Sequence, residues 1–364
     1  MTKSIKSITG IIIIIVMTAM LIIPASAMGF SVTPDLPDNQ RKNGSAFFDL
    51  LVVPGMQQEI SIRVSNPSSQ EITVLVELIT ASTAMNGQIN YTAPGEMDST
   101  LQYSFEDIAE IPQSNYTIPA RSEIDVPIKL KMPNGRFDGA ILGSIRVLRE
   151  ATAEEREAAG ALVNQYAQVI AVRLVQSENA EAIISPNFEI GEITTELVNY
   201  RASIIANIRN TEPILIKGAR ATAKIYHNNS SVPTFESIME NVDFAPNSIF
   251  PYSFVDREGV GIDSGDYNAV ITIEYQNETW TFEESFTVTA EAAVIVNESA
   301  LNQNIANSGS DIPLWAQILM GMGALIIVAI IIALVIIIRK KSKVSVEDLL
   351  KEFELKKALG AFGE

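Results

Sequence analysis

Short segments in which hydrophobic and polar residues alternate fill most of the chain between residues 30 and 290. One such segment places Ile60, Ile62 and Val64 on a single face of a strand, and turn residues such as Pro54-Gly55 flank it. The same pattern predicts further strands at residues 47–53, 72–78, 123–130, 140–148, 166–175, 183–190, 201–208, 219–227, 267–275 and 279–289. Strands of this length and spacing predict an all-β fold of immunoglobulin-like antiparallel β-sandwiches.

A change of composition divides this β region into two tandem domains. Residues 150–162 are rich in Ala and Glu, which favour helix over strand. We therefore expect a first β-sandwich over residues 28–149, a linker or short helix over residues 150–162, and a second β-sandwich over residues 163–296. Residues 297–311 are polar and show no period, so they predict a flexible stalk after the second sandwich.

Each end of the chain carries a long apolar run, and the two runs differ in their flanks. The first run follows Lys3 and Lys6 and ends before Ala25-Ser26-Ala27, which are small residues of the kind that signal peptidase requires. Residues 1–27 are therefore expected to be a secretory signal peptide. A first transmembrane helix is the alternative for this run, because its length falls only slightly short of the ~20 residues that span a membrane.

The second run, residues 312–338, contains no charged residue and is long enough to cross a hydrocarbon core of ~30 Å. Arg339-Lys340-Lys341 follows it directly, and basic residues beside a span stay in the cytoplasm. The pattern predicts a C-terminal transmembrane helix in a single-pass protein of the cell membrane, with the β-sandwiches extracellular and residues 339–364 cytoplasmic. Ser345 can cap a helix in this tail, which either lies on the inner leaflet or meets a cytoplasmic partner.

The overall composition narrows the class of partner. The chain has no cysteine, so its extracellular part depends on buried cores and not on disulfides, as is common in exported proteins of Gram-positive bacteria. The net charge is −17, and the excess of Asp and Glu lies before the second apolar run. Binding of nucleic acid requires clustered Lys and Arg, so we expect no nucleic-acid partner.

Residues that could carry catalysis are few. His227 is the single histidine and no Gly-x-Ser-x-Gly motif accompanies it, so we interpret it as a surface residue at a strand end and not as part of a catalytic triad. A glycosidase needs only two carboxylates, and spacing alone does not exclude a pair such as Asp138 and Glu157. Trp280 is the one tryptophan outside the second apolar run, which argues against the aromatic platforms of a glycan-cleaving cleft.

Two acidic segments resemble fragments of calcium loops. Neither Asp263-Ser-Gly-Asp266 nor Glu96-Met-Asp98 completes the spacing of an EF-hand, so we interpret both as turns. The sequence therefore predicts no catalytic residue, no metal-binding residue and no cofactor, and the protein is expected not to be an enzyme.

Segments of the first β region carry a family resemblance. Phe30–Gln40 (FSVTPDLPDNQ), Phe47–Gly55 (FFDLLVVPG) and Asn66–Val74 (NPSSQEITV) resemble the first extracellular domain of the WxL-interacting proteins of Gram-positive bacteria. Residues 137–145 look like the last strand of that domain, and residues 163–174 look like the start of the family's second domain. The order of signal peptide, two β domains, stalk, span and basic tail is also similar over the whole chain.

This resemblance implies a non-enzymatic binding protein that is displayed at the cell surface. It implies that the first sandwich binds peptidoglycan, that the second binds a host extracellular-matrix protein, and that the protein associates with WxL-domain surface proteins. The connector departs from the family pattern, because many relatives have a strongly basic or Lys/Glu-rich connector, whereas residues 150–162 are short and acidic to neutral.

We place the candidate binding surfaces in two segments, since an antiparallel sandwich can bind a partner chain along an exposed edge. The candidate partner-binding residues are Leu36, Asp38, Asn39, Gln40, Phe137, Asp138 and Leu142. The alternative is that Pro34, Pro37 and Gly139 in these segments only shape turns. Two further functions stay open: a cell-wall enzyme that acts on glycan, and a membrane sensor that signals through its cytoplasmic tail.

Overall fold

The computed structural model describes a large part of the chain, namely residues 29–41, 46–152, 156–157, 165–255, 261–308 and 350–355. The chain divides into two units after Asn297, and all β-sheets belong to the first unit. The predicted signal peptide, the predicted span and most of the predicted tail lie outside the described residues. Within the described ranges, no helix is both long and apolar enough to cross a membrane.

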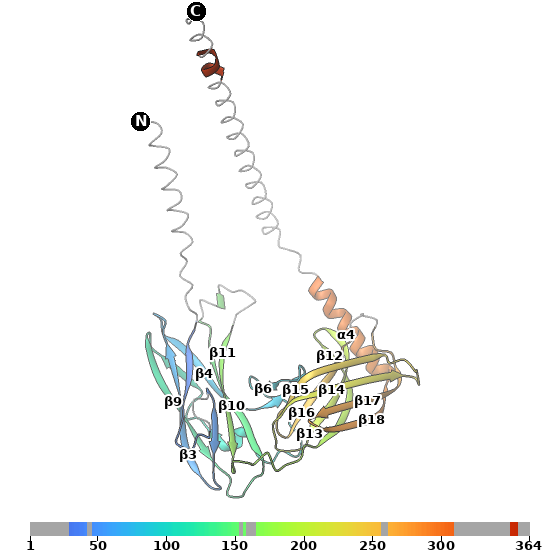
Figure 1. The fold of residues 1–364 in the computed structure, drawn as a ribbon, viewed down its shortest axis with the longest axis horizontal. Coiled ribbons are helices and arrows are strands. Elements are labelled where there is room, and N and C mark those ends of the chain that lie inside the picture. Colours follow the sequence, from blue (N-terminus) through green and yellow to red (C-terminus); the bar gives the residue numbers. More distant parts are fainter. Residues whose placement is uncertain are drawn as a thin grey trace, which may run out of the picture. The chain divides into compact units, whose positions relative to one another are not determined.

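Nine strands form the first sandwich (Figure 1). They are β1 (Ser31–Asp35), β2 (Phe48–Leu51), β3 (Gln57–Asn66), β4 (Ile72–Thr80), β7 (Ala109–Glu110), β8 (Asn115–Ile118), β9 (Ser122–Lys131), β10 (Ala140–Arg149) and β11 (Tyr166–Val175). One sheet has the order β1-β3-β9-β7 and the other the order β2-β11-β10-β4-β8. Neighbouring strands run antiparallel, with the exception of β2 and β11, which run parallel.

Alternation in the sequence accounts for the core of this sandwich. In β3, Ile60, Ile62 and Val64 are buried while the residues between them are at least partly exposed. These three side chains share one hydrophobic cluster with Val147 of β10 and Leu174 of β11, which come from the other sheet. Each fully buried side chain of this size contributes about 1.5–3 kcal/mol relative to its exposed state.

Strand β11 belongs to the first sandwich, although the sequence pattern assigned it to the second. Its ten residues all pair with β10, and Val172–Val175 also pair with β2. The side chains of Ile170, Val172 and Leu174 are buried in the first core. The composition change at residues 150–162 marks a connection between strands, whereas the sheet that a strand joins depends on partners far away in the sequence. The chain therefore enters the second sandwich only after Val175.

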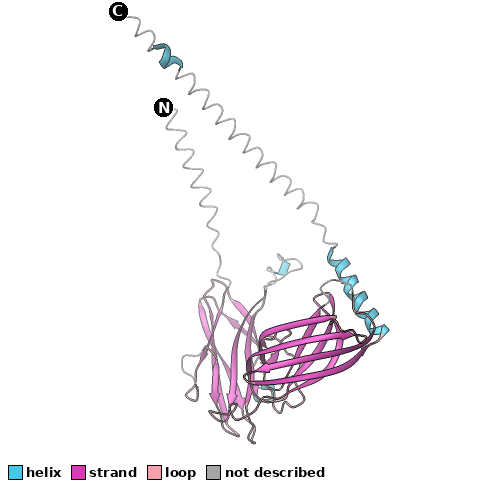
Figure 2. Cartoon of the chain, turned by 45° about the vertical axis from the view of Figure 1, so that its right-hand side comes forward, coloured by secondary structure: helices cyan, strands magenta, loops and turns pink. Residues whose placement is uncertain are grey.

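Seven strands form the second sandwich. They are β12 (Phe188–Val198), β13 (Arg201–Asn210), β14 (Ile216–His227), β15 (Phe235–Phe244), β16 (Ser248–Val255), β17 (Gly265–Tyr275) and β18 (Glu278–Val288). They make antiparallel sheets of order β12-β13-β16 and β15-β14-β17-β18. Figure 2 shows the strands of both sandwiches in magenta. The Phe188 ring of the first sheet lies 4.8 Å from Phe244 and 5.0 Å from Trp280 of the other, so aromatic packing joins the two sheets.

The all-β class and the antiparallel sheets are thus confirmed for the described residues. The predicted strand at residues 183–190 overlaps β12 only at its end, because residues 181–184 form turns and a bend. Strands β15 and β16 were not predicted. In β15 the acidic residues Glu236 and Glu240 hide the alternation, since they pair outward with Lys224 and Arg220.

A helix follows the second sandwich where the sequence predicted the end of that domain, up to residue 296, and a stalk. Helix α4 runs from Ala290 to Ser308. The Thr289 hydroxyl accepts a hydrogen bond from the Ala292 amide at 3.1 Å, and alanines with high helix propensity fill the first turn. The side chain of Asn297 exchanges two hydrogen bonds of 2.9 Å with the backbone of Ile262, which holds the helix against the loop before β17. In the predicted tail, residues 350–355 are also helical.

A segment of the first sandwich reaches across to the second. This bridging segment, residues 82–98, contains the small hairpin of β5 (Ser82–Thr83) and β6 (Ile89–Asn90). Its Gly87 carbonyl accepts a 2.7 Å hydrogen bond from Asp243 of β15, and Met97 forms a bridge with Ser248 of β16. The bridging segment therefore covers part of the edge of each sheet of the second sandwich, which would otherwise present unpaired backbone groups.

Helix α2 (Phe105–Ile108) returns the chain from the bridging segment to the first sandwich. Ser104 and Asp107 form a capping box at its start, and the Phe105 ring is buried in the first core. The Phe105 amide donates a 2.8 Å hydrogen bond to the Thr80 hydroxyl at the end of β4. Residues 99–104 thus have both ends fixed, and Thr100–Tyr103 line the pocket described next.

Candidate functional site

The predicted segment Leu36–Gln40 connects β1 to β2, and most of its side chains serve the fold. Leu36 packs against the first core. The amide of Asn39 donates to the Leu51 carbonyl at 2.9 Å and exchanges two hydrogen bonds with the amide of Gln58. Gln40 is buried, and its Oε1 accepts a 3.1 Å hydrogen bond from the backbone of Asp49. Of the four predicted residues in this segment, Asp38 alone has an exposed side chain.

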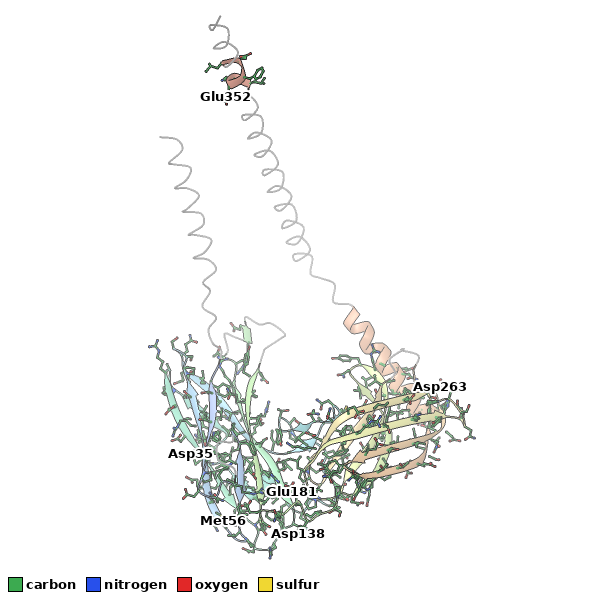
Figure 3. All side chains as sticks on the ribbon, in the orientation of Figure 1. Asp35, Met56, Asp138, Glu181, Asp263 and Glu352 are labelled. Carbon is green, nitrogen blue, oxygen red and sulfur yellow. The ribbon has the colours of Figure 1, made fainter. Side chains whose placement is uncertain are left out.

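The second predicted segment lies just before β10 and along its start. Phe137 packs into the first core, and its amide donates a 3.2 Å hydrogen bond to the side chain of Gln176. Asp138 is exposed at the loop, as its label in Figure 3 shows. Leu142 is buried in β10. Of the seven predicted residues, Phe137 and Asp138 line the pocket described below, and the other five are not among its lining residues.

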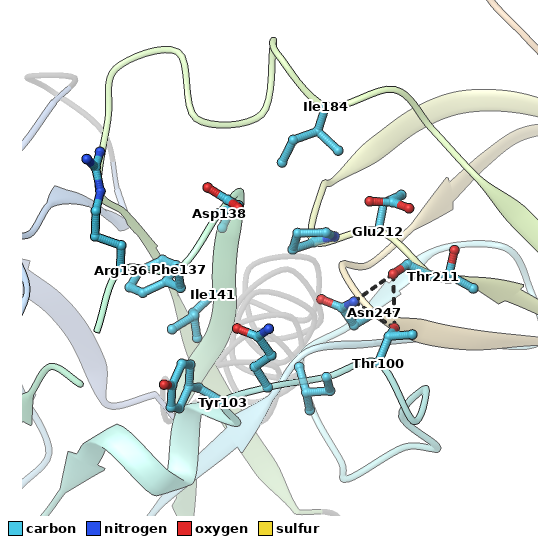
Figure 4. Close-up of a pocket in the computed structure, with 14 residues that line it drawn as sticks. Thr100, Tyr103, Arg136, Phe137, Asp138, Ile141, Ile184, Thr211, Glu212 and Asn247 are labelled. Atoms are coloured by element: carbon cyan, nitrogen blue, oxygen red, sulfur yellow. Dashed lines mark hydrogen bonds between the residues drawn. The ribbon is translucent and has the colours of Figure 1, made fainter. Parts of the chain in front are cut away.

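This pocket has a volume of about 400 Å³ and is lined by residues of both sandwiches (Figure 4). Thr100–Tyr103, Arg136–Asp138 and Ala140–Ile141 line it from the first sandwich. Thr211–Pro213, Asn247 and Ile184 line it from the second. The volume falls within the ~300–1,000 Å³ range of small-ligand sites. A ligand here would contact both sandwiches at once.

Three lining residues, Thr100, Thr211 and Asn247, form one wall of the pocket and are connected to Asp98 and Arg209 behind it. We call these five residues the joint network. The Arg209 guanidinium donates to the two carboxylate oxygens of Asp98 at 2.5 and 3.2 Å. The Thr100 hydroxyl donates to Asp98 at 2.7 Å and accepts from the Asn247 amide at 2.8 Å. Asn247 also donates to the Thr211 carbonyl at 2.9 Å. The wall is therefore fixed by its own hydrogen bonds.

The charge of Asp98 is stabilised in spite of its burial. Its side chain has no exposed surface, while that of Arg209 is 24% exposed. Burial by itself raises the pKa of Asp98, but the hydrogen bonds from Arg209 and Thr100 and the charge of Arg209 outweigh burial, so the net pKa lies below its usual value. The hydrogen bond to Asp98 in turn raises the pKa of Arg209. At neutral pH the two groups form a charged pair between the sandwiches.

A second polar cluster lies beside β2 and β11. Asp49 pairs with Arg41 at 3.1 Å and with Arg173 at 3.8 Å, and Arg173 also pairs with Glu181. Burial lowers the pKa of Arg173, and the negative charge of Asp49 opposes that shift. The Glu181 carboxylate accepts a 2.8 Å hydrogen bond from the backbone of Leu215, so this cluster too links the strands of the first sandwich to the second (Figure 3).

His227 is only partly exposed, which differs from the predicted surface position. It is the last residue of β14, and its ring stacks on Tyr267 of β17 at 4.4 Å. Its Nε2 atom is buried and has no hydrogen-bond partner. The described residues contain no cluster of three or more metal-ligating side chains. His227 thus packs as an aromatic residue at one end of the second sandwich.

Gly139 brings the two sandwiches into contact next to the pocket. Its φ is +69°, and a Cβ atom at this position would collide with the backbone carbonyl of Pro213. That carbonyl also accepts a 2.8 Å hydrogen bond from the amide of Ala140. Sequence reasoning treated Gly139 as a turn residue, and the close approach to Pro213 is the additional constraint that it could not reveal.

We expect Gly139→Ala to lower the free energy of unfolding by about 2–3 kcal/mol, because it adds the cost of a left-handed backbone to that of an overpacked contact. Thermal unfolding followed by circular dichroism measures the effect. Two control variants separate the causes. Gly218→Ala has a φ of +75° but open space around it, and Gly135→Ala has open space without a positive φ. If Gly139→Ala cost no more than Gly218→Ala, the contact with Pro213 would be unimportant.

Some solved structures are similar to this chain at low sequence identity. The YadV chaperone has 10% identity and a TM-score of 0.28, with 72% of this chain and 100% of that chain covered. The CupB2 chaperone of Pseudomonas aeruginosa has 11% identity and a TM-score of 0.26, with 65% and 96% covered. PapD-like domain 7 of human CEP192 has 10% identity and a TM-score of 0.26, with 41% and 85% covered. TM-scores this low support no inference about this chain.

Family models, in contrast, match most of the chain, whereas the curated proteins give no match. Residues 30–149 match the model of the WxL Interacting Protein, peptidoglycan binding domain. Residues 157–298 match the model of the WxL Interacting Protein, host binding domain. The two matches follow each other in the order that the sequence resemblance implied. The chain belongs to the family of WxL-interacting proteins.

Proposed function

We propose that this protein is a cell-surface binding protein that associates with peptidoglycan and with WxL-domain surface proteins, and that its second domain binds a host extracellular-matrix protein. The observation that carries the proposal is the pair of consecutive matches, to a peptidoglycan-binding domain and to a host-binding domain, over residues 30–149 and 157–298. The pocket between the sandwiches supplies a concave surface of ligand size to which both domains contribute.

We further propose that the protein is held in the cell membrane by one span at residues 312–338, with the β-sandwiches outside. The support is the uncharged apolar run and the basic residues that follow it. The protein would then work by holding its ligands near the membrane and not by chemical conversion, since both matched domains are binding domains by description.

Retention on purified cell walls tests the main proposal. The full-length protein, kept soluble in detergent micelles, is mixed with insoluble peptidoglycan sacculi, and the bound fraction is measured after sedimentation. We expect retention that rises to saturation with added sacculi, and no release of reducing ends during incubation. A parallel binding assay uses an immobilised WxL-domain protein and immobilised extracellular-matrix proteins. Failure to bind sacculi under any salt condition would remove the peptidoglycan function, and release of reducing ends would show an enzyme.

A further inference from the structure

Three charged side chains of the pocket have no partner in the described part of the protein. No ion pair or side-chain hydrogen bond within the described ranges involves the charged groups of Arg136, Asp138 or Glu212. Several other basic side chains are paired with acids, namely Arg41, Arg63, Arg146, Arg173, Arg209, Arg220 and Lys224. Unpaired charges of both signs around one concave site are available to a ligand.

These charges are spread around the pocket. Arg136 and Asp138 belong to the loop before β10 of the first sandwich, and Glu212 follows β13 of the second. In Figure 4, Arg136 lies on one side of the pocket, Glu212 lies on the other, and Asp138 lies between them. A ligand that carries a negative group at one end and a positive group elsewhere would complement this order. The guanidinium of Arg136 is well suited to a carboxylate, which it can bind through two parallel hydrogen bonds.

The remaining lining combines apolar side chains with polar ones, among them Thr100, Gln102 and Asn247. The side chains of Phe137 and Ile141 are each 7% exposed, and Leu101 and Ile184 are half-buried. Both aromatic side chains of the pocket, Phe137 and Tyr103, pack against the first core, and Tyr103 keeps part of its surface exposed. An uncharged glycan has no group that pairs with Arg136, Asp138 or Glu212, whereas a peptide with a free carboxylate and a free amine does.

We propose that this pocket binds a short peptide that has both a free carboxylate and a free amine, with the carboxylate at Arg136 and the amine near Asp138 and Glu212. The inference rests on the proposed peptidoglycan function and names its ligand: the stem peptide of the wall, not the glycan strand. Glu212 and Asn247 belong to the second sandwich, and Asn247 donates a hydrogen bond to Thr100 of the first. The site is therefore complete only when both sandwiches are present.

Calorimetric titration of the full-length protein in detergent micelles tests this assignment. The probes are the synthetic peptide N-acetyl-L-Ala-γ-D-isoglutaminyl-L-Lys-D-Ala, whose two charged groups are the C-terminal carboxylate and the lysine amine, the same peptide with an amidated C-terminus, the same peptide with an acetylated lysine, and the tetramer of N-acetylglucosamine. We expect binding of the free peptide, affinity at least about tenfold weaker for each capped peptide, and no binding of the glycan tetramer. A charged hydrogen bond of ordinary strength corresponds to a change of about 10- to 100-fold.

Variants connect the peptide groups to the side chains. Arg136→Gln is expected to weaken binding of the free peptide at least about tenfold but to leave the C-terminally amidated peptide unchanged. Asp138→Asn is expected to weaken binding of the free peptide by a similar factor, because Asp138 lies near the bound amine. It should leave the affinity for the peptide with acetylated lysine unchanged. Lys131→Gln and Asp263→Asn are the matched controls, because both side chains are exposed and outside the pocket. Neither control should change any affinity.

The outcomes separate this inference from the proposed function. Sacculi that are retained while the peptide does not bind, or while the glycan tetramer binds in its place, would overturn the peptide assignment and leave the peptidoglycan function standing. Equal effects of Arg136→Gln on the free and the amidated peptide would overturn the role of Arg136. A peptide that binds while sacculi are not retained would keep the pocket assignment and remove the peptidoglycan function.

Discussion

A fragment of residues 29–149 is expected to remain unfolded, whereas a fragment of residues 29–180 is expected to unfold cooperatively on heating. The shorter fragment corresponds to the first family match but lacks β11, which lies between β2 and β10 in the sheet. The longer fragment also retains Ala180, which packs with Ala140 and Val175. Circular dichroism and the slow exchange of amide hydrogens would distinguish a folded fragment from an unfolded one.

The size of the effect follows from what β11 buries. The side chains of Ile170, Val172 and Leu174 fill the first core, and burial of each is worth about 1.5–3 kcal/mol. Their sum is a large part of the ~5–15 kcal/mol that stabilises a typical domain. The pairing of β11 with its two neighbours is lost as well.

A synthetic peptide of residues 163–180 provides the control for this experiment. If the shorter fragment fails only because a strand is missing, the peptide should restore folding when it is added in excess. A Leu174→Asp version of the peptide should not, because Leu174 is fully buried in the core. A shorter fragment that melts at the same temperature as the longer one would show that β11 is dispensable.

Arg209→Ala is expected to lower the free energy of unfolding at neutral pH by about 3–5 kcal/mol. The carboxylate of Asp98 has no exposed surface, and the variant would leave it charged and without its cation. Chemical unfolding in urea measures the loss. Arg63→Ala is the matched control, because Arg63 and Asp125 form an exposed ion pair at 2.9 Å, which water screens, so its removal should cost much less.

The pH dependence of this loss gives a second test. In the wild type the pKa of Asp98 is below its ordinary value of 3.8, so the carboxylate stabilises the fold above about pH 4, and this contribution is lost as the pH falls through the lowered pKa. In Arg209→Ala the pKa of Asp98 should rise, because burial remains while the hydrogen bonds and the charge of Arg209 are lost, so the variant should lose less stability than the wild type as the pH falls. The stability difference between the two proteins should therefore shrink at low pH. A difference that is independent of pH would contradict the role of the charge.

The sequence predicted local structure well and long-range partners poorly. Alternation identified β3, β10 and β11, because the sequence of each strand by itself indicates which face is buried. It did not identify the sheet that β11 joins. The acidic segment Glu96–Asp98 was interpreted as a turn, yet Asp98 is the buried partner of Arg209, and no local pattern connects residues so far apart in the chain.

The candidate site shows the same limit. Phe137 and Asp138 were predicted from a family-like segment and do line the pocket. Asn39 and Gln40 come from a segment that looked equally distinctive, and their amides are occupied with backbone and side-chain hydrogen bonds of the fold. Glu212 was not predicted, because it is an ordinary glutamate in a loop and only the approach of the second sandwich places it at the pocket. A polar residue in a turn therefore signals a constraint, but not whether that constraint is structural or functional.

The parallel pairing of β2 with β11 also has a consequence for the order in which the chain acquires its structure. Synthesis proceeds from the N-terminus, so Phe48 of β2 emerges long before Val172, its partner in the sheet. Until then the five-stranded sheet lacks the strand between β2 and β10, and contacts of such long sequence separation slow folding. The first sandwich is thus still incomplete when its own matched segment ends at residue 149. Part of its core stays exposed until residues 166–175, which the sequence pattern assigned to the next domain, have been synthesised.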